Sequence, residues 1–262
     1  MRRRDFLKTA AGVGAGIAGG GVLGRLPTAF GQEQTREDDP LEQRPFGRSD
    51  VKLSVVALGG ITLQNLSDEQ CSRIMGEAID AGVNWVDSSP KYGNSEPRVG
   101  KALQPYRKRV FLACKTGKRR RDEAEDEFKG SLERLRTDHL DLYQLHSLQD
   151  LEKDVDVAFG KGGVMELMTE VKQAGKVRFL GFSAHSVESA LAAMDRYDFD
   201  SVMFPVNFSC WYKGHFGPQV VEEAQKRGMA ILALKGLCKQ RWRRWRDPRR
   251  RETGLWYQPL MD

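Results

Sequence analysis

The sequence has few cysteines and histidines, no long apolar run and little excess of one charge. Its four cysteines and four histidines are scattered, with no Cys-x-x-Cys pair and no spacing typical of a metal site. No apolar stretch reaches the roughly 18 residues that a transmembrane helix needs. The net charge of +6 is unevenly placed: residues 1–31 hold +4 and residues 239–251 hold +7, which leaves −5 for the rest. These absences argue against a metalloprotein, an integral membrane protein and a globally basic nucleic-acid-binding protein.

The first 31 residues have the composition of an export signal. The motif Arg3-Arg4-Asp5-Phe6-Leu7 precedes an uncharged stretch over residues 9–24 that is rich in Ala, Gly and Val. This stretch is too short and too glycine-rich to span a bilayer stably, and paired arginines are typical of Tat signals. Ala29-Phe30-Gly31 has small residues spaced for cleavage after residue 31. We therefore expect a Tat signal peptide, export by the Tat machinery to the bacterial periplasm or exterior, and no stable membrane anchor after cleavage.

The rest of the chain divides into a charged linker over residues 32–45 and one domain over residues 46–262. In the domain, nearly continuous apolar runs alternate with segments of helical periodicity, as in parallel sheets covered by helices. The predicted strands are Ser54–Gly60, Asn84–Ser89, Val110–Gly117, Leu140–Ser147, Val177–Ala184, Ser201–Phe208 and Ala230–Leu237. One predicted helix begins at Ser67. The other five cover about Glu96–Leu103, Ala124–Leu135, Val164–Ala174, Val187–Tyr197 and Pro218–Arg227.

This alternation predicts an α/β fold, either an open doubly wound sheet or a closed barrel. No Gly-x-Gly-x-x-Gly follows the first predicted strand, where a Rossmann fold would need it. Polar residues instead end one strand after another, as at the catalytic rim of a TIM barrel. We therefore expect a TIM-type (β/α)8 barrel. The segment Cys238–Asp262 has the pattern of neither a strand nor a helix. We therefore expect the barrel to lack its eighth βα unit.

Four polar residues near successive strand ends form a set suited to proton transfer. A free tyrosine has a pKa near 10, which makes it a poor acid at neutral pH. A neighbouring ammonium lowers that pKa by stabilising the phenolate, and a carboxylate holds the ammonium in place. A histidine on the next strand can orient a substrate carbonyl. The set is Asp87, Tyr92, Lys115 and His146, and it predicts carbonyl reduction with hydride supplied by a cofactor.

Each of these four residues alone has a structural explanation, such as a turn cap, a packed ring, an ion pair or a core histidine. Their occurrence in this order on successive strands favours the catalytic interpretation. At these residues the sequence resembles the aldo-keto reductase family. Two stretches carry the resemblance, Asp87-Ser88-Ser89-Pro90-Lys91-Tyr92-Gly93-Asn94-Ser95-Glu96 and Leu132-Glu133-Arg134-Leu135-Arg136-Thr137-Asp138-His139-Leu140-Asp141-Leu142-Tyr143-Gln144-Leu145-His146.

The resemblance implies an eight-stranded barrel that binds NADP(H) without a Rossmann domain and acts on a small carbonyl or alcohol substrate. It implies Tyr92 as the acid/base, Lys115 and Asp87 as the pair that tunes it, and His146 as the residue that orients the carbonyl. Cofactor-binding positions fall at Ser183, at Asn207, where the family often has Gln, and at Lys235, where the family often has an aromatic residue. Ala184 replaces an Asn that usually holds the nicotinamide amide.

Other functions remain open from the sequence alone. Lys115 or Lys235 could form a Schiff base with a carbonyl substrate, as in a lyase. An incomplete barrel could instead be a binding protein without catalysis, with exposed strand edges and weak NADPH binding. The run 239–251 mixes Arg and Trp, which suits either a solvated loop or an anion-binding patch, and no nucleic acid is expected as a partner. Cys210 and Cys238 follow neighbouring strands and could pair, although free thiols are the expected state.

Overall fold

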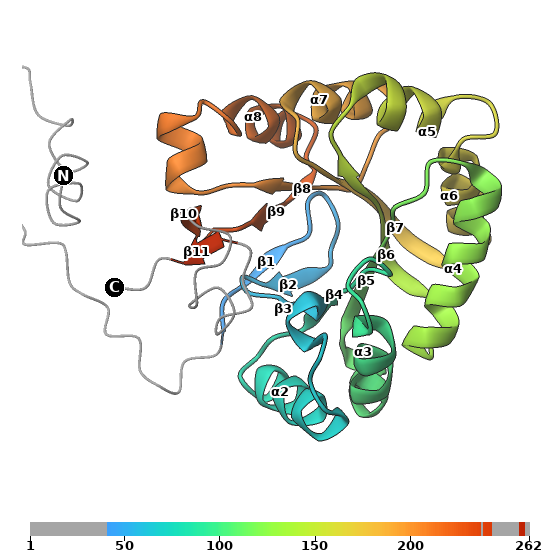
Figure 1. Ribbon diagram of the computed structural model, residues 1–262, viewed down its shortest axis with the longest axis vertical. Helices are drawn as coiled ribbons and strands as arrows, with labels where there is room; N and C mark the ends of the chain where they lie inside the picture. Colours follow the sequence, from blue (N-terminus) through green and yellow to red (C-terminus); the bar gives the residue numbers. More distant parts are fainter. Residues whose placement is uncertain (1–40, 237, 243–256, 260–262) are drawn as a thin grey trace, which may run out of the picture. The chain divides into compact units, whose positions relative to one another are not determined.

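The computed structural model describes residues 41–236, 238–242 and 257–259 (Figure 1). The chain divides into two units, Met1–Asp39 and Pro40–Asp262, and every described residue belongs to the second. The predicted signal peptide and most of the predicted linker therefore lie outside the described residues. Within the described residues, no helix combines the length and the apolar composition needed to cross a bilayer.

Seven parallel strands form the sheet that organises this unit. The strands lie side by side in chain order, β3-β4-β5-β6-β7-β8-β9, and each neighbouring pair is parallel. Each overlaps one predicted strand: β3 Leu58–Gly59, β4 Trp85–Asp87, β5 Phe111–Thr116, β6 Leu140–Leu148, β7 Val177–Ala184, β8 Ser201–Pro205 and β9 Ala230–Leu234. The described residues thus form a TIM-type barrel sheet that lacks an eighth strand.

Helices connect successive strands and cover the outer side of the sheet (Figure 1). The six predicted helices are confirmed as α2 Asp68–Asp80, α3 Ser95–Leu103, α4 Arg121–Leu135, α6 Val164–Gln173, α7 Val187–Arg196 and α8 Pro218–Lys226. The first begins at a capping box in which Ser67 and Gln70 exchange side-chain and backbone hydrogen bonds. Glycines follow three of the helices with positive φ, at Gly82, Gly175 and Gly228, a conformation that glycine adopts without a steric penalty.

Five short helical segments were not predicted from the sequence. They are η1 Gly60–Leu63, η2 Gln104–Arg109, η3 Leu151–Asp156, α5 Val157–Phe159 and η4 Ser209–Lys213. All lie in connections between a strand and a longer helix. Each is too short to show a clear helical period in the sequence.

Two antiparallel strand pairs lie outside the seven-stranded sheet. The first joins β1 Gln43–Pro45 to β2 Lys52–Ser54, so Gln43–Pro45 of the predicted linker is a strand and Ser54 belongs to this hairpin rather than to β3. The second joins β10 Cys238–Arg241 to β11 Tyr257–Pro259, a pair that the sequence analysis did not predict. Neither β10 nor β11 pairs with the seven-stranded sheet.

The alternation of side chains along each strand separates two apolar clusters. Outward-facing residues such as Val86, Leu112 and Tyr143 pack with the helices in the larger cluster. Inward-facing residues, including Trp85, Phe111, Ala113 and Leu142, form the smaller cluster with Phe46 and Leu53 of the β1–β2 hairpin. Because successive strand residues point to opposite faces, the residues two positions after Trp85, Ala113 and Leu142 point inward as well. These residues are Asp87, Lys115 and Gln144.

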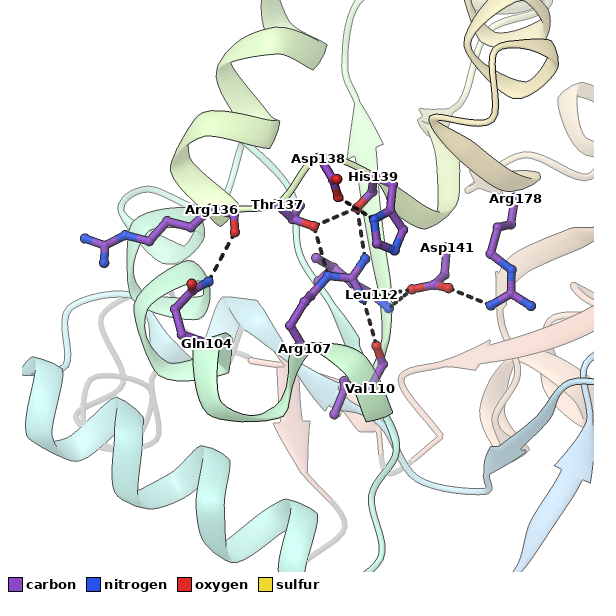
Figure 2. Close-up of polar contacts among 10 residues, drawn as sticks. All are labelled: Gln104, Arg107, Val110, Leu112, Arg136, Thr137, Asp138, His139, Asp141 and Arg178. Carbon is purple, nitrogen blue, oxygen red and sulfur yellow. Dashed lines mark hydrogen bonds and ion pairs between the residues drawn. The ribbon is translucent and has the colours of Figure 1, made fainter.

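A polar network ties together the amino-terminal ends of β5, β6 and β7 (Figure 2). The buried Asp141 carboxylate accepts the backbone N–H of Leu112 at 2.9 Å and pairs with Arg107 at 3.3 Å and with Arg178 at 2.8 Å. Arg107 also donates to the carbonyl oxygens of Val110 and His139. Since barrel enzymes carry out their chemistry at the opposite, carboxyl-terminal ends of the strands, this network has a structural role.

Candidate active site

A buried ion pair occupies the carboxyl-terminal end of β4 and β5. The Lys115 ammonium donates to the Asp87 carboxylate and to the Ser88 carbonyl oxygen, the latter at 3.2 Å. The side chains are only 1% and 11% exposed, respectively. Gln144 on β6 donates its carboxamide N–H to the second Asp87 oxygen at 3.1 Å. Burial alone would lower the pKa of Lys115, but Asp87 and Tyr92 together raise it above its usual value, so the ammonium stays charged.

Tyr92 lies above this pair, in the connection between β4 and α3. The Lys115 ammonium is 5.1 Å from the centre of the Tyr92 ring. Burial raises the pKa of the Tyr92 phenol above its ordinary value of 10, and the lowering effect of Lys115 does not overcome it. The sequence-based expectation of a lowered pKa is therefore wrong for this structure, because it omitted the cost of placing a phenolate in a half-buried position. At neutral pH Tyr92 is protonated.

His146, near the end of β6, faces Tyr92 edge-on, with ring centroids 5.6 Å apart. Burial, followed by the charges of Lys115, Lys91, Arg119 and His185, lowers the pKa of His146 to about 3. The ring is therefore neutral at physiological pH, and a neutral imidazole has one N–H donor and one acceptor nitrogen.

Ser89 is hydrogen-bonded to one nitrogen of the His146 ring. The Ser89 hydroxyl oxygen lies 3.0 Å from His146 Nδ1 and accepts the backbone N–H of Lys91 at 3.2 Å. Because its oxygen already accepts a hydrogen bond, the hydroxyl proton is available for Nδ1. This arrangement favours the tautomer with the proton on Nε2, the nitrogen not engaged by Ser89.

The three predicted cofactor residues lie at the ends of β7, β8 and β9. The buried Ser183 hydroxyl accepts the backbone N–H of Ser147 at 2.7 Å. Asn207 accepts the backbone N–H of Cys210 through its carboxamide oxygen at 2.9 Å. Lys235 has a φ of 56°, which is uncommon for a residue with a side chain, and burial lowers its pKa although Cys238 and Cys210 raise it.

Sequence analysis missed three residues at this rim: Ser89, Gln144 and His185. Burial, with a smaller effect from Lys235, lowers the pKa of His185 to about 4, which makes it a neutral residue close to the predicted cofactor side. A signal existed for Gln144, since it precedes His146 by two positions and shares its strand face. No sequence signal distinguishes Ser89 from a turn serine, because its contact joins the connection after β4 to His146 on β6.

The four cysteines form no disulfide: all are free thiols, with Cys71 and Cys114 buried. In the part of the chain that the structure describes, no three His, Cys, Asp or Glu side chains group as metal ligands. Most of the Arg- and Trp-rich run 239–251 lies outside the described residues. Its described beginning forms β10.

Comparisons with known proteins agree with this fold. The sequence profile of the Aldo/keto reductase family matches residues 55–253. YqkF, an uncharacterized oxidoreductase of Bacillus subtilis (strain 168), is 35% identical over 158 residues, which are 55% of this chain and 49% of YqkF. The aldo-keto reductase YhdN of the same organism is 36% identical over 155 residues, 53% of this chain and 44% of YhdN.

A solved structure is similar over most of the described barrel. PA4992 of Pseudomonas aeruginosa, assigned to the aldo-keto reductases, aligns with a TM-score of 0.68 at 25% identity and covers 77% of this chain and 82% of its own. The chain therefore belongs to the aldo/keto reductase family, whose members are oxidoreductases. It spans about half the length of the curated relatives named above.

Proposed function

We propose that this chain is a carbonyl reductase or alcohol dehydrogenase that transfers hydride between NADP(H) and a small substrate. The observation that supports this most strongly is the cluster at the carboxyl-terminal rim, where a buried ion pair, a protonated phenol and a neutral imidazole lie together. They come from three successive β-strands and the loop after the first. They are Asp87, Lys115, Tyr92 and His146.

In the reducing direction, Tyr92 donates the proton. Its phenol O–H gives a proton to the carbonyl oxygen as that oxygen gains negative charge, and the resulting phenolate is stabilised by the Lys115 ammonium nearby. Asp87 keeps that ammonium charged and in place. His146 donates from Nε2 to the same substrate oxygen, which orients the carbonyl and stabilises the developing charge. NADPH, held at the ends of β7, β8 and β9, would supply the hydride for the carbonyl carbon.

The donors at the ends of β7, β8 and β9 fit a nicotinamide nucleotide. Ser183 retains its hydroxyl proton after accepting from Ser147, and Asn207 uses only its carboxamide oxygen in its contact with Cys210. A hydroxyl and a carboxamide N–H are the groups that a nicotinamide amide needs as partners. The half-buried Lys235, in its charged form, would suit a phosphate. Ala184 offers no side-chain hydrogen bond, so Ser183 and Asn207 would share this task.

Isotope transfer tests the proposed reaction. The protein is incubated with NADPH carrying deuterium at both C4 positions and with a panel of aromatic and aliphatic aldehydes, and the alcohol product is analysed by mass spectrometry. We expect one deuterium on the former carbonyl carbon, with slower transfer from NADH. Consumption of aldehyde without deuterium transfer would contradict the proposal.

Schiff-base chemistry is the alternative enzyme function, and the geometry restricts it to one lysine. Lys115 is held charged by Asp87, and an ammonium is no nucleophile. Lys235 is half-buried with a lowered pKa, which favours the reactive amine. Borohydride treatment with aldehyde, followed by peptide mass spectrometry, separates the two functions: a reduced adduct on Lys235 during turnover would favour the lyase.

We also propose that the chain reaches the bacterial periplasm through the Tat machinery. The support is the motif Arg3-Arg4-Asp5-Phe6-Leu7 and the weakly apolar stretch after it. Replacing Arg3 and Arg4 by Lys keeps the charge but removes the arginine pair. We expect this variant to remain in the cytoplasm as the uncleaved form. A mature periplasmic species in the variant would contradict Tat export.

A further inference from the structure

The rim beside His146 has one positive charge that no described carboxylate neutralises. Besides buried Lys115, three groups from separate connections act on the His146 ring: Lys91, Arg119 and His185. Arg119 is held by Asp154 at 2.9 Å and by the His146 carbonyl oxygen at 2.7 Å. His185 is neutral at physiological pH, since burial lowers its pKa to about 4. Lys91 is the remaining cation.

The Lys91 side chain lies against a glycine at the neighbouring strand end. It lies along Gly117, two residues after Lys115, so closely that a Cβ there would come within 2.1 Å of Lys91 Cε and 2.6 Å of its Nζ. In this conformation the Lys91 side chain fills the space that a Cβ at position 117 would take. The missing side chain at Gly117 therefore allows the Lys91 ammonium to lie over the end of β5, on the same rim as Tyr92 and His146.

The Lys91 ammonium is exposed, and among the described residues it has no hydrogen bond or ion pair. The carboxylate of Glu127 is bound to the nearby backbone of Gly117 at 3.0 Å and to the Thr116 hydroxyl at 2.6 Å, so it is already engaged. Lys118, the cation next to Gly117 in the β5–α4 connection, pairs with Glu123 at 3.0 Å. Lys91 is thus positioned to bind a negative charge from outside the protein.

From this arrangement we propose that the substrate carbonyl compound carries an anionic group, a carboxylate or a phosphate, which Lys91 binds. The inference rests on the proposed function, because it places the carbonyl at Tyr92 and His146. Lys91 directly precedes Tyr92 and lies on the β4–β6 side of the rim, whereas Ser183, Asn207 and Lys235 follow β7, β8 and β9. The charge of Lys91 therefore acts on the substrate rather than on the nicotinamide side.

Matched aldehydes test the inference. In each pair one member has an anionic group and the other does not: 4-carboxybenzaldehyde with 4-methylbenzaldehyde, and glyceraldehyde 3-phosphate with glyceraldehyde. The quantity measured is the ratio of kcat/KM within each pair, for the full chain and for the Lys91→Gln and Lys91→Glu variants. Lys118→Gln is the control, since it removes a cation from the neighbouring β5–α4 connection that already has a partner.

We expect Lys91→Gln to reduce the charged-to-neutral ratio about threefold to tenfold, as for a partly desolvated ion pair. Lys91→Glu reduces it further, Lys118→Gln leaves it unchanged, and salt weakens the preference of the unmodified chain. The pair that shows the effect identifies the anion as a carboxylate or a phosphate. Equal ratios in the unmodified chain and Lys91→Gln, for both pairs, would overturn the inference.

Binding without turnover separates this inference from the proposed function. Affinities of 4-carboxybenzyl alcohol and glycerol 3-phosphate are measured by titration calorimetry for the same proteins. If no aldehyde is reduced, the proposed reaction fails, but weaker anion binding by Lys91→Gln still supports the charge recognition. Binding that Lys91→Gln leaves unchanged, or an unmodified chain that binds neither anion, overturns it.

Discussion

Removing the charge of Asp87 should destabilise the barrel far more than removing the charge of a surface carboxylate. Asp87→Asn keeps the shape of the side chain but leaves the Lys115 ammonium, which is 1% exposed, without its counter-charge. Breaking a buried ion pair on one side costs about 3–5 kcal/mol, because an uncompensated charge stays buried. For a domain of this size, about 2–4 °C of melting temperature is lost per kcal/mol, so a fall of roughly 6–20 °C is expected.

The matched control is Glu77→Gln on α2. Glu77 pairs with Arg73 at 3.5 Å, and the two side chains are 64% and 66% exposed, respectively. Exposed pairs of this kind contribute about 0.5 kcal/mol or less. Urea unfolding followed by circular dichroism at pH 7 gives the unfolding free energy of both variants. The comparison isolates burial, since each change converts one paired carboxylate to a carboxamide.

A double variant shows that the loss comes from the pairing. Lys115→Met alone leaves the Asp87 carboxylate with the hydrogen bond from Gln144, whereas Asp87→Asn with Lys115→Met removes both charges. The double variant should therefore recover most of the stability that Asp87→Asn loses. Equal losses for Asp87→Asn and Glu77→Gln, or a double variant whose loss is the sum of the two single ones, would refute the reasoning.

Three further predictions follow from individual contacts. Ser89→Ala should lower kcat about fivefold with little change in KM, because it removes a hydrogen bond of about 1 kcal/mol that holds the His146 ring. Steady-state kinetics measure this, and an unchanged kcat contradicts it. The unfolded His146 side chain has a pKa of about 6.5 and the folded one about 3. Between these pH values the unfolded state binds one more proton than the folded state, so the stability falls as the pH drops. His146→Phe should lessen that fall in urea unfolding at pH 7 and pH 4.5, and an equal fall would refute it. Gly100→Ala should destabilise the fold, because its Cβ would lie 2.2 Å from a backbone oxygen of α4. Gly130→Ala meets only the flexible end of an arginine and should stabilise its helix by about 0.5–1 kcal/mol. Thermal melting of both variants tests this, and shifts of the same sign would contradict it.

The sequence predicted the seven strands and six helices because their signals are local. Continuous apolar runs bounded by turn residues identify parallel strands, and the polar residues that end these runs, such as Asp87 and Lys115, must lie at the same rim. The β1–β2 hairpin was missed because its residues, from Gln43 to Ser54, lack a long apolar pattern. The pair β10–β11 was missed because Cys238–Arg241 is mostly polar and its partner strand follows sixteen residues later.

Features of the site that depend on burial were beyond the sequence. The raised pKa of Tyr92 reflects the environment around the phenol rather than the neighbouring ammonium alone. The contact of Ser89 with His146 joins residues 57 positions apart, and the space for Lys91 depends on Gly117 across the rim. Residue types and strand ends predict which groups meet, whereas their protonation follows from packing.

The central claim is that Tyr92 supplies the proton, and Tyr92→Phe tests it most directly. The variant keeps the ring beside Lys115 and His146 but has no phenol proton to donate. Turnover is followed as loss of NADPH absorbance with the best aldehyde of the panel, and NADPH affinity is measured separately by tryptophan fluorescence. The account predicts turnover reduced about 10²–10⁴-fold with nearly unchanged NADPH affinity. A Tyr92→Phe variant that turns over at the rate of the unmodified chain would contradict it.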